Sequence, residues 1–108
     1  LKTDFCITRA GASTLAELVF FEVPFLAIPF PYSKDDHQLF NAKHYKENNC
    51  CWMLEQKEIP QKNLFEIITN ILDDNKNLQL KKKAMKEISS KNTWENNNKI
   101  IIKTINEN

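Results

Sequence analysis

Glycine is almost absent from this chain of 108 residues, in which Gly11 is the single example. Loops built on several glycines are therefore excluded. These include the P-loop that ends in Gly-Lys-Ser/Thr, and with it the ATPases of that class. Because glycine lets a ligand approach the backbone without a side chain in the way, the position of the one glycine is informative.

Cysteine is scarce, and its spacing does not suit cross-linking or metal binding. Three cysteines stand at positions 6, 50 and 51, so the count is odd, two are adjacent and no Cys-x-x-Cys pair exists. This spacing argues against a disulfide framework and against a structural zinc site. We expect buried, reduced thiols in a protein that holds no metal and no cofactor.

Long apolar runs and an excess of one charge are also lacking. The most apolar stretch, Leu15 to Tyr32, is interrupted by glutamates and prolines and cannot span a membrane, so any membrane contact would be peripheral. The 15 basic and 14 acidic residues give a formal net charge of +1, and we expect no nucleic-acid partner. The 42% apolar fraction is typical of one soluble globular domain with a modest core.

Short apolar runs alternate with amphipathic segments over the first 72 residues. The predicted strands are 5–8, 25–28 and 50–54. The predicted helices are 14–22, 33–47, 60–72 with Pro60 in the first turn, 78–90, and a last amphipathic helix around Trp94, Ile101, Ile102 and Ile105. This order predicts βαβ units in an α/β fold, with a parallel sheet flanked by helices and ligands bound at the carboxyl ends of the strands.

The first candidate binding segment is Thr8-Arg-Ala-Gly-Ala-Ser-Thr-Leu-Ala-Glu17, a strand end, a turn of small residues and a helix start. Free backbone N–H groups at a helix amino terminus attract phosphate, and Arg9 could add a charged contact. The alternative is structural, because Thr14 and Glu17 match a capping box. On spacing alone, a cap is favoured over a ligand role for Glu17.

The second candidate segment runs from Pro29 to Asn41, where Asp36, His37, Gln38 and Asn41 gather at the start of one predicted helix. Amides and imidazoles both donate and accept hydrogen bonds, which suits sugar hydroxyls. From the residues alone, an ordinary capped helix start explains the cluster slightly better. No partner carboxylate or nucleophile can be placed beside His37, so the spacing does not favour a catalytic base there.

Taken together, these segments resemble the MurG family of glycosyltransferases. The run Arg9-Ala-Gly-Ala-Ser-Thr-Leu-Ala-Glu17 is followed, in the family's order and spacing, by Pro24, Ile28-Pro-Phe-Pro31, Asp36-His-Gln38 and Asn41-Ala42. The resemblance implies a GT-B architecture of two Rossmann-like domains. Residues 1–108 would then be the carboxyl-terminal, UDP-sugar-binding domain, in a chain cut from a longer protein and lacking the amino-terminal acceptor domain.

The resemblance also implies roles for individual residues. Glu17 would bind the ribose hydroxyls, and the backbone around Ser13 would meet the diphosphate. Gln38 would contact a sugar hydroxyl. The implied substrate-binding set is Arg9, Ala12, Ser13, Thr14, Glu17, His37, Gln38 and Asn41. The family's proposed catalytic base lies in the other domain, so no catalytic residue is assigned here.

The implied activity is the inverting transfer of N-acetylglucosamine from its UDP carrier to an undecaprenyl-linked muramyl-pentapeptide in peptidoglycan synthesis. The enzyme would work peripherally at the cytoplasmic face of the bacterial inner membrane. Two alternatives are the catalytic subunit of a two-chain dolichol-linked transferase and a non-catalytic nucleotide-sugar-binding module. The sequence departs from the family at Val23, where glycine is usual, and at Asn49-Cys50, where Gly-Ala is common. We expect these changes to affect turns rather than the ligand.

Overall fold

A computed structural model of the chain describes residues 5–89. Within this range three short strands form one parallel sheet in the order β1-β2-β3. The strands are β1 (Cys6–Thr8), β2 (Phe25–Ala27) and β3 (Cys51–Met53). In the register of the sheet, Ile7 pairs with Leu26, and Leu26 pairs with Trp52. The α/β fold with a parallel sheet flanked by helices, as expected from the sequence, is confirmed.

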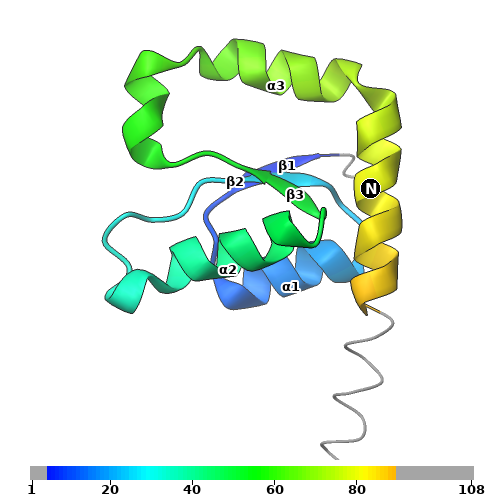
Figure 1. The fold of residues 1–108 in the computed structure, drawn as a ribbon, viewed down its shortest axis with the longest axis horizontal. Helices are drawn as coiled ribbons and strands as arrows, with labels where there is room; N and C mark the ends of the chain where they lie inside the picture. The colour runs from blue at the N-terminus through cyan, green and yellow to red at the C-terminus, as the bar shows by residue number, and fades with distance from the viewer. Residues whose placement is uncertain (1–4, 90–108) are drawn as a thin grey trace, which may run out of the picture.

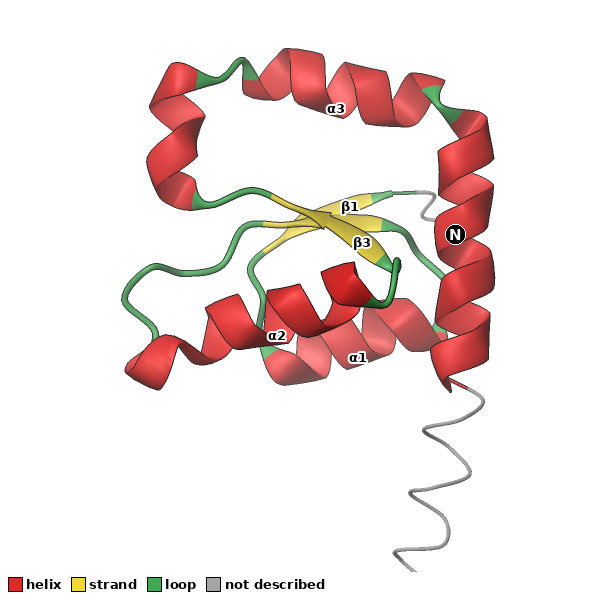
Figure 2. Cartoon of the chain, viewed as in Figure 1, coloured by secondary structure: helices red, strands yellow, loops and turns green. Residues whose placement is uncertain are grey.

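The helices form a layer on each face of the sheet (Figures 1 and 2). They are α1 (Ala12–Phe20), the 3-10 helix η1 (Lys34–Asp36), α2 (His37–Glu47), the 3-10 helix η2 (Gln56–Gln61), α3 (Leu64–Asp73) and a helical stretch over 75–89. Helices α1 and α2 cover one face of the sheet. Both βαβ crossovers have the same hand, and each new strand is added on the same side of the previous one, so the two helices lie on the same face. Helix α3 covers the other face. The last helix predicted around Trp94 lies outside the described residues.

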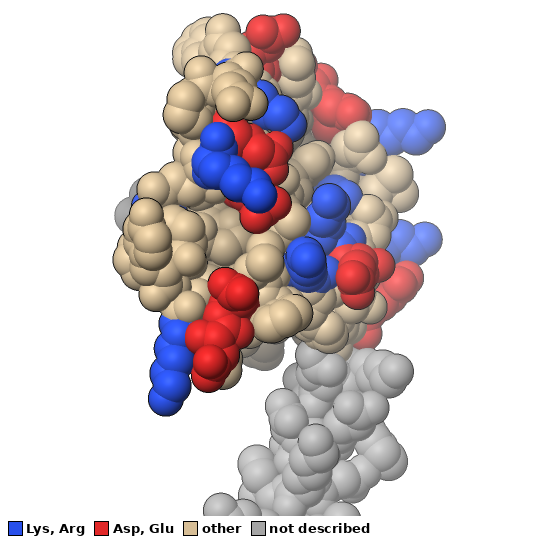
Figure 3. Space-filling view, turned by 60° about the vertical axis from the view of Figure 1, so that its left-hand side comes forward, with Lys and Arg blue, Asp and Glu red and all other residues tan. Residues whose placement is uncertain are grey.

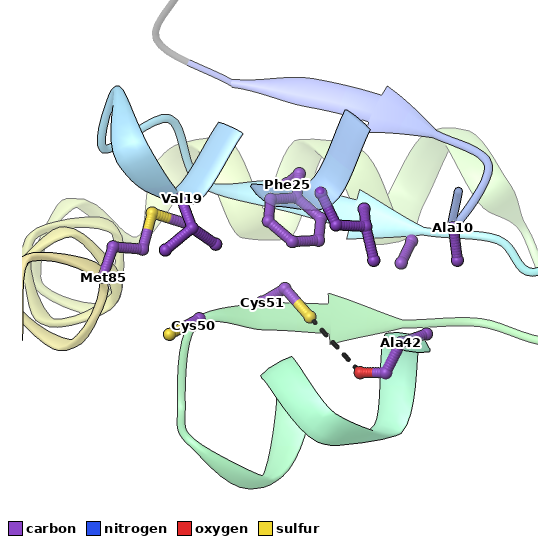
Figure 4. Close-up of a cluster of buried hydrophobic side chains, with 9 residues drawn as sticks. Ala10, Val19, Phe25, Ala42, Cys50, Cys51 and Met85 are labelled. Carbon is purple, nitrogen blue, oxygen red and sulfur yellow. Dashed lines mark hydrogen bonds between the residues drawn. The ribbon is translucent and has the colours of Figure 1, made fainter. Parts of the chain in front are cut away.

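Two apolar clusters fill the spaces on either side of the sheet. Beneath α1 and α2, Phe25 and Cys51 pack with Leu15, Val19 and Met85 (Figure 4). On the α3 side, the buried cluster consists of Leu26, Ile28 and Leu54, against which Leu64, Ile67 and Ile68 pack. Strand β2 is therefore buried on both faces, which explains why its sequence is continuously apolar.

The predicted starts of the first and third of these helices, α1 and α3, are wrong, because other residues cap them. Helix α1 begins at Ala12 with Gly11 as its N-cap, so Thr14 lies inside the helix and the predicted Thr14–Glu17 capping box is absent. Helix α3 begins at Leu64 rather than at Pro60, because the Asn63 side chain accepts a hydrogen bond from the backbone N–H of Glu66 at 3.1 Å. Pro60 instead lies inside η2.

Both α1 and α2 end in a Schellman motif whose left-handed residue is not glycine. At the end of α1, Val23 N–H donates to Leu18 O at 2.9 Å and Glu22 N–H donates to Val19 O at 3.1 Å, with Glu22 at a φ of 56°. Asn49, at a φ of 61°, holds the same place after α2. The altered turn after α1 is thus centred on Glu22, one residue before the Val23 that the sequence pointed to.

Glu22→Gly is expected to raise the free energy of unfolding by about 1 kcal/mol. The left-handed conformation costs a non-glycine residue about 1–2 kcal/mol, and glycine removes this cost. Part of the gain is offset, because glycine has a larger conformational entropy in the unfolded chain. Urea unfolding would measure the change. As a matched control, Glu47→Gly in the last turn of α2 should lower stability by about 0.5–1 kcal/mol, since Glu47 is helical. Equal effects at the two sites would contradict the assignment.

The adjacent thiols of Cys50 and Cys51 are expected to make the free energy of unfolding depend on pH in the alkaline range. Burial raises the pKa of Cys50 from 9.0 to about 11 and that of Cys51 from 9.0 to about 12. The folded protein therefore keeps protons that the unfolded chain releases, so this stabilisation is complete below pH 9 and is lost as pH rises through the folded pKa values. We expect a steeper alkaline loss of stability in the native chain than in Cys51→Ala. Parallel pH profiles in urea would contradict the expectation.

Candidate functional site

The two candidate loops lie side by side at the carboxyl ends of β1 and β2, on the left in Figure 1. The side chain of Gln38 joins them, because its Oε1 accepts hydrogen bonds from Ala10 N–H at 3.1 Å and from Phe30 N–H at 2.8 Å. Asn41 adds a third bond, in which Nδ2 donates to Ala10 O at 3.0 Å. The loop ahead of α1 and the loop ahead of α2 are thus tied together by residues of α2.

These bonds limit what Gln38 and Asn41 can offer a ligand. Both acceptor sites of the Gln38 carbonyl face backbone N–H groups, which leaves the Nε2 amide as the group that can donate outward. Asn41 uses Nδ2 internally, so its Oδ1 remains as an acceptor. A sugar hydroxyl at this edge would therefore accept from Gln38 and donate to Asn41.

The amino terminus of α1 forms the floor of the first loop. Ala12, Ser13 and Thr14 are exposed in the first turn, and Glu17 is exposed one turn later. Helical side chains lean toward the amino terminus, a direction in which the carboxylate of Glu17 can reach the turn that contains Ser13 and Thr14. A ribose and a diphosphate could contact this surface together.

Gly11 is not required by the fold. Its φ of −65° and ψ of 140° are open to any residue, and a Cβ built there would meet Thr14 Oγ1 at 3.9 Å, an ordinary contact distance. Neither backbone strain nor lack of space explains the glycine. The close approach of a ligand to the backbone remains a physical reason for it.

Arg9, which follows β1, contacts residues that follow β2 and the first residue of η2. Its Nη1 donates to Gln56 Oε1 at 2.7 Å and to Ile28 O at 3.4 Å, and its guanidinium lies 5.7 Å from the centroid of the Phe30 ring. It also borders a hollow of about 330 Å³ whose other lining residues are Ile7, Thr8, Ile28, Gln56 and Ile59. Sequence reasoning missed Gln56, although its place two residues after the third predicted strand was a usable signal.

His37 opens α2 and is exposed. The two residues before it, Asp35 and Asp36, have left-handed φ values of 53° and 55°, so the chain turns sharply into the helix. The Ser33 hydroxyl completes this start by accepting a hydrogen bond from Gln38 N–H at 3.2 Å. His37 is therefore held at the rim of the second loop, on the solvent side.

A second hollow, of about 120 Å³, lies between the loop at Pro29–Pro31 and the start of η2. Neither hollow is lined by Ser13, Thr14, Glu17 or His37. Figure 3 brings the loop side of the molecule forward and shows charges of both signs, interspersed with uncharged residues. Over residues 5–89 the candidate site is an open surface at the edge of the sheet.

No group of three or more His, Cys, Asp and Glu side chains within 5–89 could hold a metal ion. None of the helices described is both long enough and apolar enough to cross a membrane.

Comparisons with known proteins identify a family and several relatives. A family model described as the glycosyltransferase family 28 C-terminal domain matches residues 1–97. The chain is 54% identical over 107 residues to the UDP-N-acetylglucosamine–N-acetylmuramyl-(pentapeptide) pyrophosphoryl-undecaprenol N-acetylglucosamine transferase of Pelagibacter ubique (strain HTCC1062), covering 99% of this chain and 30% of the relative. The protein of the same name from Wolbachia pipientis subsp. Culex pipiens (strain wPip) is 43% identical over 68 residues, covering 63% of this chain and 20% of the relative.

A solved structure is similar as well. The crystal structure of Acinetobacter baumannii MurG superimposes with a TM-score of 0.61 at 26% identity, covering 81% of this chain and 24% of that one. The likeness agrees with the GT-B fold class expected from the sequence. This chain spans about 30% of the length of the Pelagibacter relative. Because the family model matches residues 1–97, the chain belongs to the glycosyltransferase family 28 C-terminal domain family.

Proposed function

We propose that residues 1–108 form the UDP-sugar-binding domain of a hexosyltransferase that transfers N-acetylglucosamine from UDP to a lipid-linked muramyl-pentapeptide. The observation that carries the proposal is the junction of the two strand-end loops by Gln38 and Asn41, which brings the α1 amino terminus and the polar start of α2 to one surface. The Pelagibacter relative, whose name describes this reaction, supports the choice of donor and acceptor.

In this proposal the ligand lies along the edge from α1 to α2. Glu17 accepts hydrogen bonds from the ribose hydroxyls, and the first-turn amides of Ala12, Ser13 and Thr14 donate to the diphosphate. Gln38, Asn41 and His37 face the sugar. These donors, together with the positive end of the α1 dipole, stabilise the charge that develops on the departing UDP during inverting transfer.

The acceptor and the catalytic base are assigned to the part of the relatives that this chain does not span. The undecaprenyl-linked acceptor would meet the nucleotide-sugar across a cleft between two domains. We propose that the enzyme works at the cytoplasmic face of the bacterial inner membrane as a peripheral protein, because its lipid-linked acceptor is anchored there.

Titration calorimetry of the 108-residue chain with UDP-N-acetylglucosamine and with ATP tests the donor assignment. We expect saturable binding of the UDP-sugar, competition by UDP, and much weaker binding of ATP, which carries neither the uracil base nor the sugar of this ligand. Preferential binding of ATP, or no binding of either UDP ligand, would overturn the proposed function.

A further inference from the structure

Arg9 is restrained by a residue distant from it in the sequence. Gln56 lies 47 positions further along the chain, and its Oε1 accepts from Arg9 Nη1 at 2.7 Å. The aromatic ring of Phe30 lies against the same guanidinium, at 5.7 Å. An exposed arginine side chain usually samples many rotamers, so two contacts from two different loops restrict where its charge can be.

Gln56 is itself held firmly. It is the first residue of η2, whose start is fixed by a capping box between Glu55 and Glu58. Immediately upstream, Leu54 N–H donates to Ala27 O at 2.9 Å, which anchors the end of β3 to β2. The backbone that carries Gln56 is therefore anchored to the sheet, and its exposed side chain extends from this fixed point to Arg9.

The contacts leave part of the guanidinium available. Arginine carries five N–H donors, and the bonds to Gln56 and Ile28 both use Nη1. Nε and Nη2 remain as a planar pair of donors, which is the geometry that matches phosphate oxygens. This pair of donors lies at the carboxyl ends of the strands, next to the loop that leads into α1.

We propose that Gln56 is a positioning residue for the diphosphate of the ligand, and that it acts by holding the Arg9 guanidinium at the strand ends. The inference rests on the proposed function, because it assumes that a UDP-sugar binds at this edge. It assigns a binding role to the start of η2, which contributes no direct ligand contact. Gln56 keeps the charge of Arg9 in place before the ligand arrives.

A double-mutant cycle in the 108-residue chain tests the inference. Gln56→Met keeps the length of the side chain but removes the acceptor, and we expect it to weaken UDP binding by about tenfold, as measured by calorimetry. Arg9→Met should weaken binding at least as much, and Gln56→Met should add nothing in that background. Gln61→Met, at the other end of the same 3-10 helix, should leave the affinity unchanged.

A second measurement separates positioning from simple loss of structure. Uridine carries no phosphate, so its binding, followed by NMR chemical-shift titration, should be the same in the native chain and in Gln56→Met. Equal weakening of uridine and UDP, additive effects of the two substitutions, or full UDP affinity in Gln56→Met would each overturn the inference alone. A native chain that binds no UDP ligand would overturn the proposed function and the inference with it.

Discussion

Gln38→Ala is expected to reduce both the stability of the chain and its affinity for UDP-N-acetylglucosamine. The substitution leaves two backbone N–H groups without their acceptor. Ala10 is fully buried, so its N–H gains no water in exchange, whereas Phe30 is partly exposed and its N–H can be solvated. A buried donor that loses its partner costs about 1–3 kcal/mol, and we expect a loss of about 2 kcal/mol in the free energy of unfolding.

Gln38→Glu separates the two roles of this side chain. A carboxylate still accepts from both N–H groups, so the junction of the loops and the stability should be retained above the pKa of the new side chain. The outward Nε2 donor is lost, however, and the affinity for the UDP-sugar should fall by about tenfold or more. Urea unfolding and calorimetry on the two variants measure the two effects.

Two outcomes would contradict the two roles assigned to Gln38. If Gln38→Glu binds the UDP-sugar as tightly as the native chain, then Nε2 donates nothing to the ligand and Gln38 is structural only. If Gln38→Ala is as stable as the native chain, the two loops are held together by other contacts. A variant at His37, which is exposed and accepts no backbone bond in the described structure, should leave stability unchanged and serves as the control.

Local periodicity predicted the elements of this fold well, because each element has a simple pattern. Strand β2 is continuously apolar since both of its faces are covered, and α3 packs Leu64, Ile67 and Ile68 against the sheet. The helix starts were predicted less well. Spacing that matches a capping box does not decide where a helix begins when a residue such as Gly11 can start it one turn earlier.

Two features of the candidate site depend on contacts that no local pattern contains. The bond between Arg9 and Gln56 joins segments 47 residues apart. The use of Gln38 Oε1 as a structural acceptor depends on how closely two loops approach. Sequence reasoning placed both loops at one sheet edge from the βαβ order. It could not predict which donor and acceptor atoms of each side chain bond within the protein and which remain available to a ligand.

The scarcity of glycine has a structural counterpart. Within residues 5–89, four residues with positive φ, namely Glu22, Asp35, Asp36 and Asn49, stand where a glycine would be free of strain. Asn49 recovers part of this cost, because its Oδ1 accepts from Lys81 Nζ at 2.6 Å. The aspartates occupy the loop ahead of α2, so strain is concentrated beside the candidate site. The single glycine, in contrast, stands where the backbone does not need it.

Glu17→Ala is expected to weaken the binding of UDP-N-acetylglucosamine by about 10- to 100-fold, because hydrogen bonds to a charged group contribute about 1.5–3 kcal/mol. Its effect on stability should stay within about 0.5 kcal/mol, since Glu17 is an exposed residue within α1 and does not cap it. From the sequence alone, Glu17→Ala would be expected to lower affinity and stability together, because Glu17 could also cap the helix. Since the capping box is absent, we expect the affinity to fall without a loss of stability.

Glu47→Ala provides the matched control, since Glu47 is an exposed helical glutamate at the far end of α2. It should leave the affinity unchanged. Glu17→Gln refines the result further: an amide can still accept from a ribose hydroxyl but lacks the charge, so its affinity should fall between those of the native chain and Glu17→Ala. If all three variants bind the UDP-sugar equally, the carboxylate above the first turn of α1 contacts no ligand, and the ribose must be held elsewhere.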